Sequence, residues 1–232
     1  INERHEAWGS LARKLAHEIK NPLTPIQLTI DRLKSKYSSQ LSEKDKSNYK
    51  ENVKIINNQI KQIEKLVNEF SDFARMPKPI FQQNDLVELI IENIKLLQEL
   101  DTSINIKFEN KVSIINLDSD REQLSRVFLN LIKNSIESIQ QKDQNDNNTN
   151  KKIDIELNDH DDHINLTIID TGIGFENLKS NIKDILNPYF TTKKNGTGLG
   201  LSIVNKIIND HNGNIEFIPI NDGAKIKIIF KK

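Results

Sequence analysis

A histidine, a glutamate and an asparagine stand close together in the segment AHEIKNPLTP, at positions 17, 18 and 21. The apolar residues around them follow a helical spacing, and His17 falls on the opposite side of that helix from Leu15 and Ile19, so it should face solvent. A neutral imidazole near pH 7 is a usable nucleophile. Glu18 could hydrogen-bond the ring or take its proton, and Asn21 follows one turn later on the same face. A lone surface histidine usually has no catalytic function. The hypothesis that His17 is a nucleophile therefore depends on the neighbouring Glu18 and Asn21.

Two prolines interrupt the helical pattern directly after this group. An interior proline lacks an amide donor and costs a helix about 3 kcal/mol. Pro22 removes the helical donor to the carbonyl of Glu18, and Pro25 does the same to Asn21. The pattern therefore predicts a loosened turn around the acid and the amide.

A second polar group lies on one face of an expected helix at 120–140. Asn130, Asn134 and Glu137 are spaced i, i+4 and i+7, beside an apolar stripe made of Leu124, Val127, Phe128, Leu131, Ile132 and Ile136. Asparagine is a mediocre helix former, so two at one-turn spacing beside a core do not serve helix stability. Their oxygens suit a Mg²⁺ ion that also holds phosphates. The alternative is an ordinary solvated helix face.

Asp170 ends an apolar strand in the segment IIDTGIG and is followed by Gly172 and Gly174. A carboxylate at a strand end can accept a hydrogen bond from an exocyclic amine, and the glycines allow the close approach of a ligand. Turns that contain Asp and Gly are also common at strand ends without any function.

The segment NGTGLGLSIV places glycines directly before a further expected helix, where backbone amides form an anion site. It matches neither the dinucleotide fingerprint nor the P-loop. The long stretch before it has the length of a lid or of a disordered segment, and as a lid it could be closed over a triphosphate by Phe190, Lys193 and Lys194. The three glycines are Gly196, Gly198 and Gly200.

Composition narrows the class of protein. The 232 residues contain 33 Lys and Arg against 33 Asp and Glu, so no net electric field favours binding to nucleic acid or anionic lipid. The chain has no cysteine, which excludes disulfides and thiol chemistry. No apolar run approaches the roughly 20 residues that span a bilayer. The remaining histidines form no cluster with acids at metal spacing, so we expect no zinc site at His5, His160, His163 or His211.

Two long helices should form an N-terminal hairpin, with Ser42 and Asp45 as a capping box for the second. The second helix carries an a/d heptad seam, which a hairpin cannot bury alone. Pairing with a second copy in a four-helix bundle is the economical solution, and packing on the rest of the same chain is the alternative. The seam consists of Tyr49, Val53, Ile56, Ile60, Ile63, Val67 and Phe70.

Prolines near residues 76–80 mark the boundary between two domains, 1–76 and 77–232. In the second, a capping box of Ser119 and Glu122 should open the helix at 120–140. Helices and strands mix without strict alternation, which indicates an α+β fold. Helices are expected at 86–100 and 199–210, and strands at 104–108, 112–117, 152–157, 163–170, 214–218 and 224–230.

Taken together, five segments in order resemble the motifs of bacterial sensor histidine kinases of two-component systems. AHEIKNPLTP resembles the H box, LNLIKNSIES the N box, IIDTGIG the first glycine box, PYFTTK the F box and GTGLGLSIV the second glycine box. The resemblance implies a helical hairpin that dimerises into a four-helix bundle, followed by a Bergerat-type (GHKL) α/β-sandwich ATP-binding domain. It also implies autophosphorylation from Mg-ATP and transfer to an aspartate of a response-regulator receiver domain.

The resemblance assigns a role to each residue of the helical hairpin that was singled out. His17 would be the phospho-acceptor and Glu18 its polarising partner. The pattern HExxN is similar to kinases that also dephosphorylate the receiver, where Asn21 would position water. In the family, the proline kink lets the bundle bend at the acceptor histidine.

In the second domain, Asn130 would contact phosphates, Asn134 would hold Mg²⁺ and Glu137 would support the site. Asp170 would read the adenine amino group and Phe190 would anchor the lid. Lys193 and the glycines would face the phosphates, the glycines being Gly172, Gly174, Gly196, Gly198 and Gly200.

A narrower resemblance lies in LARKLAHEIKNPLTPIQL and EFSDFARMPKP, which are similar to NtrY-type nitrogen-regulation sensor kinases. These usually carry a membrane-bound sensory half upstream, so the resemblance implies a cytoplasmic kinase core with an inner-membrane parent. The C-terminal hairpin NDGAKIKIIF is reduced relative to the family, which implies a shorter turn. Two other functions stay open: an inactive scaffold that binds nucleotide and partner, and a stand-alone Bergerat ATPase.

Overall fold

The computed structural model describes residues 2–37, 41–74, 76–99, 102–143, 150–175, 182–193 and 196–232. These residues form two compact units. One comprises Ile1–Pro77 together with Thr191–Leu199, and the other comprises Lys78–Phe190 together with Gly200–Lys232. No helix within the described ranges is long and apolar enough to cross a membrane.

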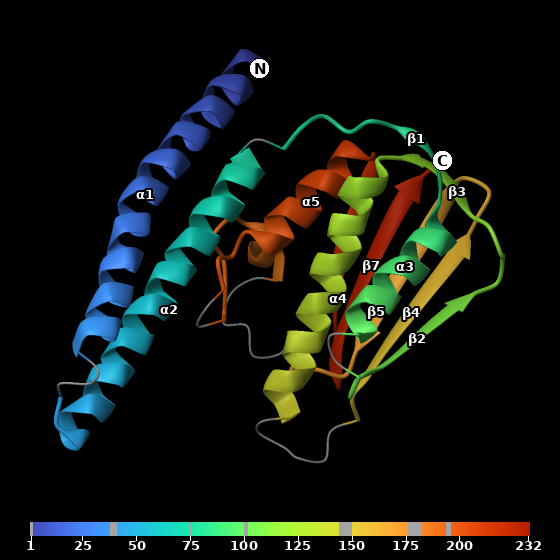
Figure 1. Ribbon diagram of the computed structural model, residues 1–232. Helices are drawn as coiled ribbons and strands as arrows, with labels where there is room; N and C mark the ends of the chain where they lie inside the picture. The colour runs from blue at the N-terminus through green and yellow to red at the C-terminus, as the bar shows by residue number, and fades with distance from the viewer. Residues whose placement is uncertain are drawn as a thin grey trace. The chain divides into compact units, whose positions relative to one another are not determined.

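The first unit is built on a hairpin of two long helices, α1 (Asn2–Tyr37) and α2 (Glu43–Ala74) (Figure 1). Helix α1 continues through Pro22 and Pro25, so the two prolines do not end it. The expected capping box of α2 is confirmed: the Asp45 N–H donates to Ser42 Oγ over 3.2 Å, and the Ser42 hydroxyl donates to the Asp45 carboxylate over 2.5 Å.

The hairpin buries only part of the apolar seams predicted for its helices. Its core cluster comprises Leu23, Ile30, Val53 and Ile60, with Tyr49 packed against it. Two helices touch along a single line, so residues on the flank of each seam are left uncovered. The uncovered residues, each more than 40% exposed, include Leu15, Ile19, Ile26, Leu33, Ile56 and Ile63.

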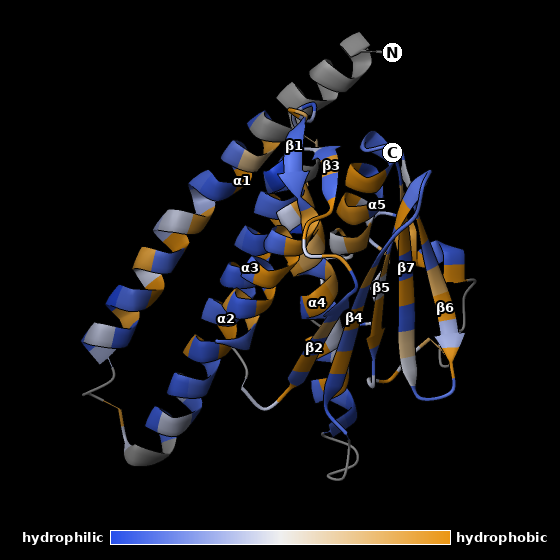
Figure 2. Ribbon diagram, turned by 90° about the vertical axis from the view of Figure 1, so that its right-hand side faces the viewer, coloured by the Kyte–Doolittle hydropathy of each residue, from blue (hydrophilic) through white to orange (hydrophobic). Residues whose placement is uncertain are grey.

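The second unit is a layer of helices on one face of a five-stranded sheet (Figures 1 and 2). The strand order is β2-β4-β5-β7-β6, in which β2 and β4 are parallel and the other pairs antiparallel. This mixed order confirms the expected α+β class. The strands are β2 (Asn105–Asn110), β4 (Lys152–Asp159), β5 (His163–Asp170), β6 (Gly213–Ile220) and β7 (Gly223–Lys231).

The covering helices are α3 (Leu86–Gln98), α4 (Arg121–Asp143) and α5 (Gly200–Asp210). Every residue of the stripe predicted for α4 is buried. The sheet strands alternate between buried and less buried residues, most regularly in β4, as a sheet covered on one face should. Because the apolar sides of α4 and β5 face each other, the polar residues at the end of β5 meet the polar residues of α4.

A smaller sheet pairs β1 (Gln82–Asp85) with β3 (Asn116–Ser119), and here two expectations were wrong. Only the end of the strand expected at 112–117 is a strand. The cap of α4 is Asp120, whose Oδ1 accepts from the Gln123 N–H over 3.0 Å, and not Ser119. Ser119 is held in β3, where its hydroxyl donates to the Leu117 carbonyl. A short 3₁₀ helix, η1 (Ile182–Leu186), was not expected.

Candidate functional site

Asp170 is the centre of the polar group at the end of β5. Its side chain is buried, with the residue 3% exposed. The Gly172 N–H donates to Oδ1 and the Ser135 hydroxyl donates to Oδ2, each over 2.9 Å. Burial raises the pKa of the Asp170 carboxyl above its ordinary value, although these two donors, the Ala224 backbone and the Lys142 ammonium oppose the shift. A buried carboxylate held this way is an acceptor prepared for a ligand donor.

The loop that follows Asp170 is packed so closely that its glycines are required. A Cβ on Gly172 would lie 2.1 Å from Ser138 Oγ, and one on Gly223 would lie 1.7 Å from the Asp170 carbonyl oxygen. Gly174 and Gly223 also have positive φ values, 66° and 119°. The glycines of the described part of this loop therefore lie in close contact with Ser138 of α4 and Gly223 of β7.

Three residues of α4 that the sequence analysis did not select hold this loop in place. Besides Ser135, the Ser138 hydroxyl accepts from the Ile173 N–H over 3.1 Å. The Lys142 ammonium donates to the Thr171 carbonyl over 3.0 Å and pairs with the Asp222 carboxylate. Positions 135, 138 and 142 share one helix face, which is a signal in the sequence, but their partners become visible only in the fold.

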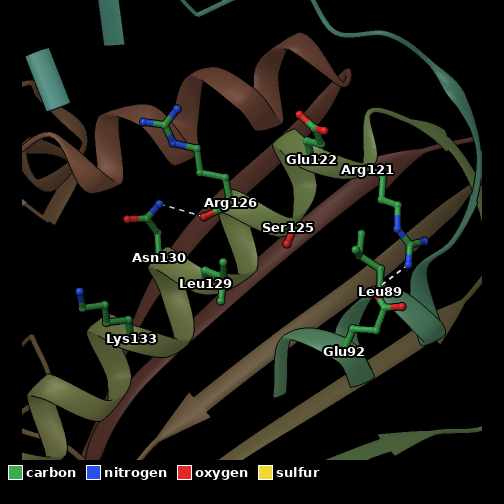
Figure 3. Close-up of a pocket in the computed structure, with 9 residues that line it drawn as sticks. All are labelled: Leu89, Glu92, Arg121, Glu122, Ser125, Arg126, Leu129, Asn130 and Lys133. Atoms are coloured by element: carbon green, nitrogen blue, oxygen red, sulfur yellow. Dashed lines mark hydrogen bonds and ion pairs between the residues drawn. The ribbon is translucent and has the colours of Figure 1, made fainter. Parts of the chain in front are cut away.

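The polar face of α4 predicted from its spacing lies beside the start of α5. The Asn130 amide donates to the Arg126 carbonyl over 2.8 Å (Figure 3), and its Oδ1 lies 3.2 Å from the position a Cβ would take on Gly200. Asn134 and Glu137 follow on the same face, and all three are half-buried. The structure thus brings Asn130 and Gly200 together. Asp170, at the end of β5, contacts the same helix further along, at Ser135.

Figure 3 shows a hollow along the outer side of α4, between it and α3. Arg121 pairs with Glu92 over 2.7 Å and with Glu88 over 3.4 Å at one end of the hollow. Asn130 is the one predicted site residue in its lining, and Asp170 is absent from it. The hollow therefore does not contain the proposed base-reading group.

The residues of the H box lie on α1 and are exposed, as expected: His17, Glu18 and Asn21. Leu15 and Ile19 are themselves more than 40% exposed, so His17 is not set apart from them by burial. The buried neighbour is Ala16.

The predicted lid is described in part. Phe190 is half-buried and follows Tyr189, whose φ is 68°. Lys193, Gly196 and Gly198 belong to the segment Thr191–Leu199, which groups with the helical hairpin and not with the sheet unit. Lys194 lies outside the described residues.

No group of three or more His, Cys, Asp or Glu side chains in the described part of the chain could hold a metal ion. A Mg²⁺ ion bound with a nucleotide needs few protein ligands, because it keeps several waters and binds phosphates. The amide oxygen of Asn134 and the carboxylate of Glu137, both on the polar face of α4, are suitable hard donors. The residues present therefore fit a Mg²⁺ ion that arrives with its nucleotide.

Comparison with known proteins gives two family matches. Residues 7–79 match the His Kinase A (phospho-acceptor) domain, and residues 119–232 match the histidine kinase-, DNA gyrase B-, and HSP90-like ATPase. The first match contains His17 and the second contains every residue singled out from Asn130 onward.

Two curated relatives match almost the whole chain. A sensor histidine kinase NtrY-like of Rickettsia felis is 37% identical over 99% of this chain and 37% of its own length. The nitrogen regulation protein NtrY of Azorhizobium caulinodans is 36% identical over 99% of this chain and 29% of its own length. The chain thus spans well under half the length of these relatives.

Two solved structures also match this chain. The histidine kinase ThkA, in complex with the response regulator protein TrrA, matches with a TM-score of 0.66 and 29% identity over 100% of this chain and 64% of ThkA. Full-length ShkA in complex with AMPPNP matches with a TM-score of 0.68 over 95% of this chain and 45% of ShkA, and at 18% identity it supports the fold alone.

Proposed function

Because this chain belongs to the sensor histidine kinase family, with a phospho-acceptor domain and a GHKL-type ATPase domain, we propose that it autophosphorylates His17 from Mg-ATP and passes the phosphoryl group to a response regulator. The observation that best supports this proposal is the buried Asp170 carboxylate at the end of β5, beside the polar face of α4. It supports a purine site in a chain that also presents an exposed histidine.

In the proposed reaction, a ring nitrogen of His17 attacks the γ-phosphorus of ATP in line with the leaving oxygen of ADP. The new N–P bond forms as the P–O bond to ADP breaks, and Glu18 polarises the ring or accepts its proton. In the second step, an aspartate of the receiver domain attacks the same phosphorus and His17 leaves.

Most of the residues that would hold the nucleotide in this scheme belong to the sheet unit, whereas Lys193, Gly196 and Gly198 belong to the segment Thr191–Leu199. Asp170 accepts a hydrogen bond from the adenine amino group, and Asn130 contacts the phosphates. Asn134, with Glu137 beside it, would hold a Mg²⁺ ion, which would supply positive charge against the phosphates. Gly172 and Gly174 let the base approach, while Gly196, Gly198 and Gly200 offer backbone amides to phosphate. Phe190 anchors the lid and Lys193 faces the phosphates.

We propose a homodimer formed by the hairpins, because each leaves large apolar side chains of both helices uncovered. The response-regulator partner is proposed from the ThkA–TrrA complex, and a role in nitrogen regulation from the name of the NtrY relative. We propose that the boundary between the phosphotransfer and ATP-binding domains follows residue 76.

The first prediction tests the phospho-acceptor. His17→Gln should abolish incorporation of labelled phosphate from ATP while nucleotide affinity stays within about twofold, because the expected base-reading group is Asp170. His160→Gln, which changes an exposed histidine in the turn between β4 and β5, is the matched control and should be phosphorylated like the unaltered chain. Labelling that survives in His17→Gln contradicts the assignment.

The alternatives give different results in the same experiment. An inactive scaffold binds nucleotide without labelling, and a stand-alone ATPase hydrolyses ATP without any acid-labile phosphoprotein. The intact H box disfavours both.

The second prediction concerns a phosphatase activity at Asn21. Dephosphorylating a receiver needs a water held in line with the aspartyl phosphate, and an uncharged amide one turn from His17 can hold it without repelling phosphoryl oxygens. Asn21→Ala should keep most kinase activity and slow the decay of a phosphorylated receiver roughly tenfold or more. Equal decay with both proteins shows that Asn21 has no such role.

A further inference from the structure

The Asp170 carboxylate is surrounded by donors from the protein itself. A carboxylate offers about four acceptor sites. The Gly172 N–H occupies an acceptor site on Oδ1, and the Ser135 hydroxyl occupies an acceptor site on Oδ2. A hydrogen bond from the Ala224 backbone also stabilises the ionised carboxylate. Little acceptor capacity remains, so the site is suited to one further N–H donor.

Ser135 differs from the other two donors. A backbone N–H only donates and is fixed by the chain, whereas a hydroxyl can rotate and can either donate or accept. Ser135 is also 1% exposed, so water does not replace its hydrogen bond readily. It is therefore the rotatable donor whose removal would change the hydrogen bonding of the Asp170 carboxylate.

We propose that Ser135 is a specificity-determining residue, which keeps Asp170 an acceptor and so selects a purine with an amine at C6, as in ATP, over one with an oxo group at C6, as in GTP. This inference rests on the proposed function, in which Asp170 reads the base. An ionised carboxylate accepts from an amine, whereas a protonated carboxyl also offers a donor, which suits a carbonyl oxygen. Removing the Ser135 hydroxyl favours the protonated form.

The groups around Asp170 define the expected pH response. On α4, Lys142 is the charged neighbour, and it is paired with Asp222 of the turn before β7. The strand neighbours of Asp170 are Ile153 on β4 and Ala224 on β7, which do not titrate. Burial already raises the pKa of Asp170, so losing a donor should raise that pKa further.

The chain supplies a matched control one turn along α4. Ser138 has the same side chain, but its hydroxyl accepts from the Ile173 backbone and does not bond the carboxylate. A change at Ser138 therefore alters the loop but leaves the Ser135 hydroxyl on the Asp170 carboxylate.

The test measures ATP and GTP affinity of the whole chain by equilibrium binding between about pH 5 and about pH 8. Ser135→Ala should weaken ATP binding roughly tenfold, reduce GTP binding less, and move the acid-side loss of ATP affinity to higher pH. Ser135→Cys keeps the shape of the side chain but has a weaker donor. Its ATP affinity should lie between those of the unaltered chain and Ser135→Ala. Ser138→Ala should affect both nucleotides alike, without moving the pH profile.

An unmoved pH profile and an unchanged ATP-to-GTP ratio in Ser135→Ala overturn the inference. Asp170→Asn separates this failure from failure of the proposed function. If Asp170→Asn binds ATP as the unaltered chain does, Asp170 does not read the base. If it loses ATP while Ser135→Ala behaves normally, only the role of Ser135 is wrong.

Discussion

At the scale of single residues, the buried carboxylate of Asp170 is unfavourable for stability, which is consistent with its proposed role in binding. A carboxylate in an apolar environment costs free energy unless donors surround it. The donors here oppose the effect of burial without cancelling it, since the pKa of Asp170 remains above its ordinary value. A fold selected for stability alone would have no reason to keep an acid at the buried end of β5.

The third prediction follows from the sign of this pKa shift. Between the unfolded pKa, about 3.9, and the higher native pKa, the native state binds more protons than the unfolded state, so this carboxyl contributes less to stability as pH rises. An amide cannot titrate. The unfolding free energy of Asp170→Asn minus that of the unaltered chain should therefore fall as pH is lowered from about 7 to about 5.

Urea unfolding of both proteins without nucleotide measures this difference. Asp118→Asn, which removes an exposed carboxylate on β3, is the control for the loss of one negative charge. A difference that stays constant with pH means that Asp170 titrates normally.

At the scale of elements, α4 serves two purposes with two faces. Positions 130, 134 and 137 form the face proposed for phosphates and Mg²⁺, and positions 135, 138 and 142 hold the loop after Asp170. Any rotation of α4 about its axis would displace both groups together, so its first turn must be fixed firmly. Asp120 provides this fixation.

Asp120 joins three segments at the start of α4. Its Oδ1 accepts from Gln123, and its Oδ2 accepts from the Ile80 N–H over 2.8 Å. Its own N–H donates to Nε2 of His211 over 3.0 Å, and the other ring nitrogen of that buried histidine lies 2.8 Å from the Ile207 carbonyl. The start of α4, the segment before β1 and the end of α5 are thus connected.

The fourth prediction is that Asp120→Ala lowers the unfolding free energy of the chain by about 2 kcal/mol, since a helix cap and a second charge-assisted hydrogen bond are both lost. Asp118→Ala removes an exposed carboxylate nearby and should change stability by less than about 0.5 kcal/mol. Denaturant unfolding compares the two variants. Equal stabilities would show that Asp120 is not the cap that matters.

The two capping boxes show how far local sequence can be read. Ser42–Asp45 stands in a loop between two helices, where nothing else claims the serine, and the prediction was right. Ser119 stands three residues before Glu122, but its pairing with Gln82 in the β1–β3 sheet makes it a strand residue, so Asp120 caps α4 instead. That pairing joins segments far apart in the chain and leaves no local signal.

The residues of the candidate site also divide into those that local sequence predicts and those that only the fold reveals. Asp170 could be predicted from its place at a strand end, and Asn130 and Asn134 from their spacing on one helix. Ser135 and Gly223 could not, because their importance comes from contacts with Asp170 across the fold. Single-sequence patterns find groups that face a ligand more readily than the residues that hold those groups.

At the scale of the whole molecule, the hairpin is incomplete as a folded unit. Its buried cluster is small, while a row of large apolar side chains on both helices stays exposed. Such a row is costly in water and is typical of an interface. A second copy carries the same row on the same two helices, so a two-fold pairing would cover both rows at once.

The fifth prediction tests this pairing with the double variant Ile56→Glu and Ile63→Glu. These two residues are 45% and 43% exposed, so the substitutions spare the hairpin core, yet two carboxylates per chain would be placed inside the proposed bundle. Sedimentation should show a dimer for the unaltered chain and a monomer for the variant. ATP affinity should stay within about twofold, because Asp170, the residue proposed to read the base, is on β5. The control Ile80→Glu changes an isoleucine that is 72% exposed in the sheet unit and should remain dimeric. If the unaltered chain is itself a monomer, the seam is covered within one chain. If it is a dimer that the double variant does not disrupt, the two copies meet through another surface.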